Sequence, residues 1–123
     1  MSVGKQEALQ QTLIALRSAL PEVRGVLIAS TDGLPMAQNL SGSEDPNRVA
    51  AMAATALGLG KRISDTLNAG ALSETSVSGA NGQIFLYAAG AKGVLVVVTP
   101  ANANVGLIHL ESRDAARSIA AIL

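Results

Sequence analysis

Apolar residues recur at alternating steps of four and three along residues 45–68, a spacing typical of an amphipathic helix. Asp45 is a good N-cap, and Pro46 suits the first helical position because its missing N–H is not needed there. The apolar stripe consists of Val49, Met52, Ala53, Ala56, Gly60, Ile63 and Leu67. We therefore predict that this segment is the central helix and that the stripe faces a core.

The opposite side of this helix carries small residues, Ala51, Ala54 and Gly58, where a solvated helix usually carries charge. Glycine in a helix interior costs about 1 kcal/mol relative to alanine, which indicates a packing reason. Two interpretations remain open. Either the alanines simply fill an exposed surface, or the helix is buried on two faces. On the second interpretation we predict a partner-binding surface formed by Ala51, Ala54, Thr55, Gly58 and Arg62.

The chain before this helix predicts one helix and one hairpin. Residues 2–20 place leucines at helical spacing. The short apolar runs 24–30 and 34–39 flank Asp32-Gly33, and an Asp-Gly pair favours a tight turn because glycine tolerates positive φ. Pro35 marks the second run as an edge strand, since proline cannot donate to a neighbouring strand.

The chain after the central helix predicts three more strands, over residues 73–79, 83–89 and 94–99. Asn81-Gly82 supplies a hairpin turn between the first two. Residues 94–99 are apolar at every position but the last, so this strand is predicted to be central and covered on both faces.

A final helix begins after Asn102 or Asn104, either of which can cap it. Its apolar side consists of Val105, Ile108, Ala115, Ile119 and Ile122. The order is therefore α-β-β-α-β-β-β-α, in a single α+β domain over residues 1–123.

Composition narrows the class of partner. Charged residues make up 15% of the chain, against about 25% in a typical domain, while apolar residues make up 49%. This surface is short of charge, which favours self-association. Nine basic and nine acidic residues cancel, so neither nucleic acid nor a membrane surface is an expected partner.

The start lacks an apolar signal region, and Pro100 interrupts the longest uncharged run, so we expect a cytoplasmic protein without membrane insertion.

No active site is visible in the sequence. Residues 58–61 (GLGK) imitate a phosphate loop, but Thr55 stands where the motif needs glycine and Arg62 where it needs Ser or Thr. His109 is the only histidine and cysteine is absent, so a metal site or nucleophilic triad lacks its members. We predict that His109 is a packed or half-exposed helix residue, and that the protein has no catalytic residues, cofactor or metal.

The run 25–37 (GVLIASTDGLPMA), the alanine-rich helix, the Asn81-Gly82 hairpin and the run 104–110 (NVGLIHL) together resemble the Roadblock/LC7 family. The most specific segment is residues 30–35, STDGLP. The likeness covers residues 2–123. The chain is also similar to the single-domain prokaryotic members that work beside small Ras-like GTPases.

This resemblance implies a profilin-like, five-stranded antiparallel sheet with the middle helix on one face and the terminal helices on the other. It also implies a homodimer in which the third strands pair and the middle helices lie side by side. The third strand here is residues 74–79, which carry no proline or lysine to block strand addition. The expected dimer interface is Thr75, Ser76, Val77 and Ser78.

The function implied by the resemblance is a non-catalytic, homodimeric regulatory module that binds a small Ras-like GTPase and modulates its activity. The alternative is a structural adaptor, similar to a dynein light chain, that presents a dimeric platform to another protein. A third possibility, a small-ligand or enzymatic domain, requires a polar pocket that the sequence does not indicate.

Overall fold

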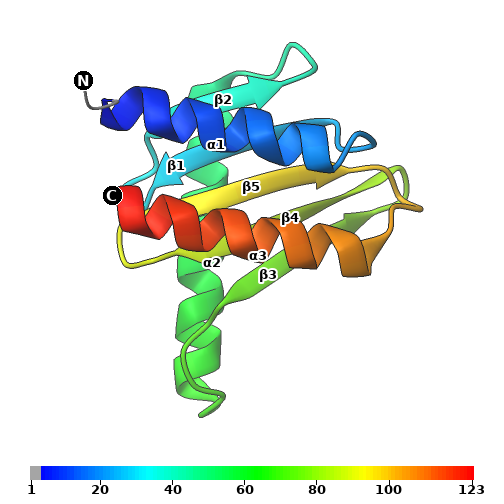
Figure 1. Ribbon diagram of the computed structural model, residues 1–123. Helices are drawn as coiled ribbons and strands as arrows, with labels where there is room; N and C mark the ends of the chain where they lie inside the picture. Colours follow the sequence, from blue (N-terminus) through cyan, green and yellow to red (C-terminus); the bar gives the residue numbers. More distant parts are fainter. Residues whose placement is uncertain (1–3) are drawn as a thin grey trace.

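The structure, a computed structural model, describes residues 4–123 (Figure 1). The first residues of the predicted 2–20 helix lie outside this range. In chain order the elements are α1 (Lys5–Ala19), β1 (Gly25–Ser30), β2 (Pro35–Leu40), α2 (Pro46–Thr66), β3 (Glu74–Gly79), β4 (Gly82–Ala89), β5 (Gly93–Thr99) and α3 (Val105–Ile122). The predicted order is confirmed.

The five strands form one antiparallel sheet in the order β2-β1-β5-β4-β3. Strand β5 lies at its centre and β2 at an edge, as predicted. Helix α2 covers one face of the sheet, and α1 and α3 lie side by side on the other (Figure 1). The predicted layers are therefore confirmed.

Two apolar cores hold these layers together. On one face the leucines of α1 pack with residues such as Tyr87, Val97 and Ile119. On the other face α2 packs mainly through Ala50, Ala53 and Leu57. Alanine lets a helix approach a sheet closely, and complete burial of a leucine or isoleucine contributes about 1.5–3 kcal/mol. The small alanine side chains of α2 therefore allow this helix to pack closely on the sheet.

Local capping and turn residues explain where the elements begin. Asp45 accepts a hydrogen bond from the Asn47 N–H, and Asn104 accepts one from the Leu107 N–H, so Asn104 is the cap of the last helix. Gly33 has a φ of 89°, as the Asp-Gly turn requires.

The turn between β3 and β4 is one residue away from its predicted place. Gly79 pairs with Gly82, so Ala80 and Asn81 form the turn and Gly82 is the first residue of β4. Strand pairing extends further toward the turn than the Asn-Gly pattern indicates.

The orientation of α2 about its axis corrects the predicted core stripe. The buried residues of α2 are Ala50, Ala53, Leu57 and Ser64. Three residues of the predicted stripe are mostly exposed, Met52 at 58%, Ile63 at 52% and Leu67 at 72%. Ile63 and Leu67 are exposed because the C-terminal half of α2 projects beyond the sheet, where no strand covers it (Figure 1). Met52 lies in the N-terminal half, on the side of the helix that borders the groove between α2 and the sheet.

Candidate functional site

The outer face of α2 holds all five residues predicted to bind a partner. Ala51, Thr55 and Arg62 are exposed, while Ala54 and Gly58 are half-buried. Arg62 forms no salt bridge with any residue between 4 and 123. The five residues therefore share one shallow face, and binding of a partner there remains a prediction.

Part of this face is already occupied by the hairpin between β1 and β2. A Cβ built on Gly33 would stand 3.3 Å from the Cα of Ala51 and 3.9 Å from the Cβ of Ala54. The STDGLP turn thus packs against the N-terminal half of α2, and its exposed Leu34 lies beside that contact. Packing of this turn within the protomer therefore explains the small side chains at 51 and 54, and the sequence did not reveal that contact.

The two glycines of α2 have different surroundings. A Cβ on Gly60 would stand 2.8 Å from Cδ2 of Leu72, in the connection that leads to β3. A Cβ on Gly58 would meet nothing within 4 Å among the described residues. Gly60 is therefore explained by packing within the protomer, whereas the surface at Gly58 is open to a partner.

A second surface lies on the flank of α2, and we call it the apolar flank. Its residues are Met52, Leu59 and Ile63 of α2, Leu67 at the C-cap of that helix and Val77 of β3, all of them exposed. Beside it runs a groove of about 660 Å³ between α2 and the sheet, lined largely by apolar side chains that include Val49, Ala56 and Ile84. The sequence pattern placed Met52, Ile63 and Leu67 in the core of the protomer and Val77 in the dimer interface, and it did not single out Leu59.

Strand β3 forms one edge of the sheet and, within residues 4–123, pairs with β4 alone. Thr75 is half-buried, while Ser76, Val77 and Ser78 are exposed. The structure thus brings the predicted dimer residues together on a strand whose outer edge is unpaired among the described residues, beside the apolar flank. Strand pairing between protomers remains a prediction.

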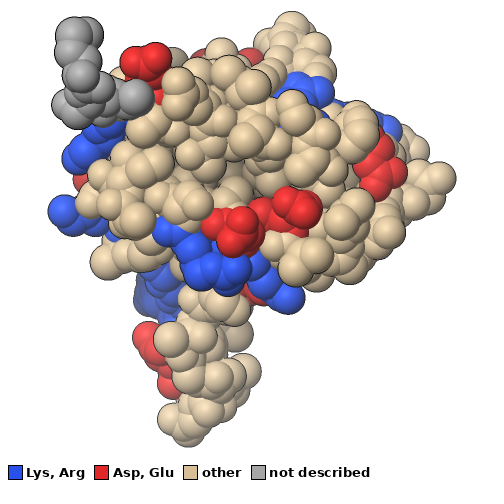
Figure 2. Space-filling model, in the orientation of Figure 1, with Lys and Arg blue, Asp and Glu red and all other residues tan. Residues whose placement is uncertain are grey.

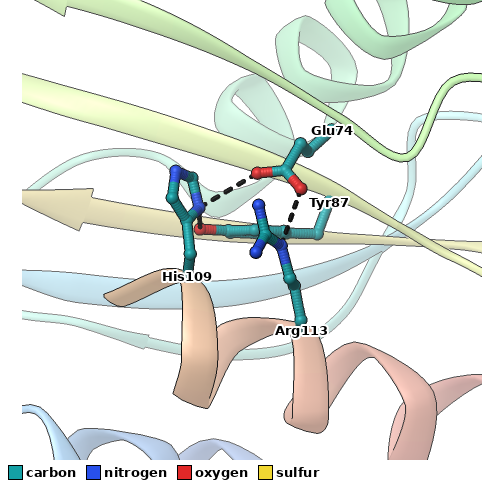
Figure 3. Close-up of polar contacts among 4 residues, drawn as sticks. All are labelled: Glu74, Tyr87, His109 and Arg113. Carbon is teal, nitrogen blue, oxygen red and sulfur yellow. Dashed lines mark hydrogen bonds and ion pairs between the residues drawn. The ribbon is translucent and has the colours of Figure 1, made fainter. Parts of the chain in front are cut away.

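A polar cluster joins the start of β3 to α3 on the opposite face of the sheet (Figure 3). The Nε of Arg113 lies 2.8 Å from Oε1 of Glu74, and Nδ1 of His109 lies 3.0 Å from Oε2 of the same carboxylate. The same Nδ1 lies 2.8 Å from the hydroxyl oxygen of Tyr87. His109 is therefore half-exposed, as predicted, but it takes part in a network that the sequence did not indicate.

Burial raises the pKa of Tyr87 to about 12, and the nearby charge of Glu74 acts in the same direction. The charge of Arg113 acts in the opposite direction. The Ser112 hydroxyl is itself buried, with no hydrogen-bond partner among residues 4–123. The hydrogen bond to Glu74 raises the pKa of Arg113. Tyr87 is thus a neutral phenol at physiological pH.

The remaining surface offers little chemistry. No group of three His, Cys, Asp or Glu residues between 4 and 123 is arranged to hold a metal ion. Figure 2 shows a largely uncharged surface on which acidic and basic side chains lie together over α3. Over the same described range, every helix is too short or too polar to cross a bilayer. The surfaces available for function are therefore the outer face of α2, the apolar flank and the edge of β3.

The sequence model of the Roadblock/LC7 domain matches residues 9–99. The chain belongs to the Roadblock/LC7 family. Uncharacterized protein MJ1340 of Methanocaldococcus jannaschii is 37% identical to it over 100 residues, which are 81% of this chain and 87% of that protein. The resemblance based on the STDGLP turn and the element order is thereby confirmed.

Solved structures show the same fold. Gliding protein MglB from Thermus thermophilus superposes with a TM-score of 0.87 at 17% identity, covering 99% of this chain and 93% of that one. The Roadblock/LC7 domain from Streptomyces avermitilis superposes with a TM-score of 0.83 at 19% identity, covering 89% of this chain and 92% of that one. At these identities the likeness establishes the profilin-like Roadblock architecture.

Proposed function

We propose that this protein is a cytoplasmic, non-catalytic regulatory module that forms a homodimer and binds a small Ras-like GTPase. The observation that carries the proposal is the position of the apolar flank beside the unpaired edge of β3. A second copy of the chain, related by a two-fold axis, can cover the apolar flank and pair with the edge of β3 at the same time. Its β3 would extend the sheet, and its α2 would cover the flank.

The energetics support such a dimer. Met52, Leu59, Ile63 and Val77 are each at least half exposed, so each can gain about 1 kcal/mol on burial. Both protomers contribute the same four side chains, and paired β3 strands add main-chain hydrogen bonds. Association costs about 4–15 kcal/mol in lost freedom of motion, a cost that apolar burial of this size largely offsets.

The outer face of α2 supports the second half of the proposal. Gly58 and Arg62 lie on the side of α2 turned away from Met52 and Ile63, so they can stay accessible when the flank is covered, whereas Thr55 lies one turn from both Met52 and Leu59 and borders the flank. Two such faces side by side would form one low platform. Close approach at Gly58 and pairing of Arg62 with a partner's carboxylate would carry recognition. Regulators and scaffolds of the Roadblock/LC7 family, which this chain resembles, fit the same interpretation.

The test uses purified small Ras-like GTPases from the same organism, each loaded with GDP or with a GTP analogue. We expect at least one of them to bind the dimer in calorimetry, and we expect Arg62→Glu to weaken binding by about tenfold or more. Arg117→Glu makes the same charge change on α3, on the opposite face of the sheet, and is the matched control.

Binding by none of these GTPases in either nucleotide state would overturn the GTPase assignment. Equal loss of affinity in both variants would show that the effect is one of net charge and that the outer face of α2 is not the site.

A further inference from the structure

The sheet has two edge strands, β2 and β3, and they differ in how their main-chain groups are satisfied. The outer edge of a sheet presents unpaired N–H and C=O groups to which a strand from a second molecule can add. Among residues 4–123, side chains from another element donate to the main chain of β2 but not to that of β3. The donors come from α1, which lies over β1 and β2 (Figure 1).

The hydrogen bonds between β1 and β2 show which main-chain groups of β2 point outward. Ser41 donates its N–H to the carbonyl oxygen of Arg24. In an antiparallel pair of strands, hydrogen-bonded residue pairs alternate with pairs that exchange no hydrogen bond. By the register of the two strands, Gln38 and Leu40 belong to pairs of the second kind. Their N–H and C=O groups therefore face the open edge of the sheet.

Side chains occupy these outward groups within the protomer. Nε2 of Gln6 donates to the carbonyl oxygen of Met36, and Nε2 of Gln10 donates to that of Gln38 at 3.2 Å. The side-chain oxygen of Gln38 accepts the N–H of Leu40 at 3.1 Å. Successive outward groups of β2 are thus bonded without a neighbouring strand.

The match depends on the geometry of a helix beside a strand. Four residues of helix advance about 6 Å, and two residues of strand advance about 6.6–6.8 Å. Donors four positions apart on α1, Gln6 and Gln10, therefore reach carbonyls two positions apart on β2. Arg17, two turns further along, donates to the carbonyl oxygen of Asn39 at 3.1 Å. Pro35 at the start of β2 has no N–H to offer a new strand.

We propose that α1 closes the β2 edge to strand addition, so that the sheet adds a second copy of the chain only at β3. A strand arriving at β2 needs the outward carbonyls as acceptors, and it must displace the glutamine amides that already donate to them. At β3 no such displacement is needed. A sheet with one open edge forms a closed pair, whereas two open edges let further copies add repeatedly. The preference for β3 rests on the proposed dimerisation, whereas the closure of β2 does not.

The test replaces both glutamines with methionine, which keeps a long unbranched side chain and a similar helix propensity but removes the donors. In sedimentation velocity, Gln6→Met/Gln10→Met should form species larger than those of the wild type, at concentrations at least about tenfold below those at which the wild type forms them. Gln11→Met/Ser18→Met, at exposed positions of α1, is the matched control and should sediment as the wild type does. Adding Gln38→Lys to the first variant should restore the wild-type size, because lysine on an edge strand opposes pairing.

A Gln6→Met/Gln10→Met variant that sediments as the wild type does at every concentration would overturn the closure of β2. Equal growth in the control variant would also overturn it, because added methionine would then be the cause. So would large species that persist with Gln38→Lys, because their growth would not run through β2.

A Val77→Lys background separates this proposal from the proposed dimer. We expect a monomer when both glutamines are intact and association through β2 when they are replaced. A wild type that is monomeric would overturn the dimer through β3. Growth of Gln6→Met/Gln10→Met beyond the wild-type size would still decide whether α1 closes β2.

Discussion

Gly33 lies so close to α2 that a Cβ built on it would stand 3.3 Å from the Cα of Ala51. Its φ of 89° lies in a region of backbone conformation that residues with a Cβ rarely adopt. The STDGLP turn is therefore constrained both by its own backbone and by the helix beneath it.

We expect Gly33→Ala to destabilise the protein by about 1–3 kcal/mol, because the strained φ and the contact with Ala51 act together. The midpoint of urea unfolding measures the effect. Gly58→Ala is the control, since its Cβ meets nothing within 4 Å among residues 4–123, and it should stabilise by up to about 1 kcal/mol. Equal effects at the two positions would contradict the contact between the turn and α2.

A longer side chain at Gly58 should separate folding from partner binding. Gly58→Gln should leave the urea midpoint unchanged or higher, because the site is open and helix propensity improves. Binding to the GTPase should be lost in calorimetry. Ala54→Gln should destabilise as well, since residue 54 lies against the Gly33 turn. Gly58→Gln that binds normally would show that the partner does not use this face, and loss of the dimer in the same variant would assign the face to the dimer.

Val77 on β3 tests the proposed dimer. Val77→Lys places a charge on the edge strand and on the apolar flank, and Val77→Pro removes a main-chain donor from the same strand. Light scattering at micromolar concentration should report a dimer for the wild type and a monomer, or aggregate, for both variants. Lys92→Ala, at an exposed turn on another part of the chain, should remain dimeric. A monomeric wild type would refute the interface.

Tyr87 provides a direct measure of the polar cluster, because it is the only tyrosine and tryptophan is absent. Tyrosinate absorbance of the folded protein should rise with a midpoint near the pKa of about 12, two units above the ordinary value of 10.0. The folded state then holds a proton that the unfolded state loses above about pH 10, so stability should fall as pH rises from there toward 12. A midpoint near 10 in the folded protein, equal to that in urea, would show that Tyr87 is not buried.

Local sequence signals determined the elements and their order. Asp45 and Asn104 cap helices through hydrogen bonds to residues two or three positions away, and Gly33 supplies the positive φ of a four-residue turn. The continuous apolar run at residues 94–99 placed β5 at the centre of the sheet. Such signals can be read from the sequence because both partners of each interaction lie within a few positions of one another.

Only the tertiary structure decided which side of α2 faces the sheet, why Gly60 is a glycine and what His109 contacts. The spacing of Ile63 and Leu67 is the same whether a helix covers a sheet or projects beyond it. Gly60 leaves room for the side chain of Leu72, which lies beyond the turn that follows α2. His109, on a helix, contacts Glu74, on a strand of the sheet. These contacts join residues far apart in the chain, and their existence depends on the relative placement of whole elements, which no local pattern records.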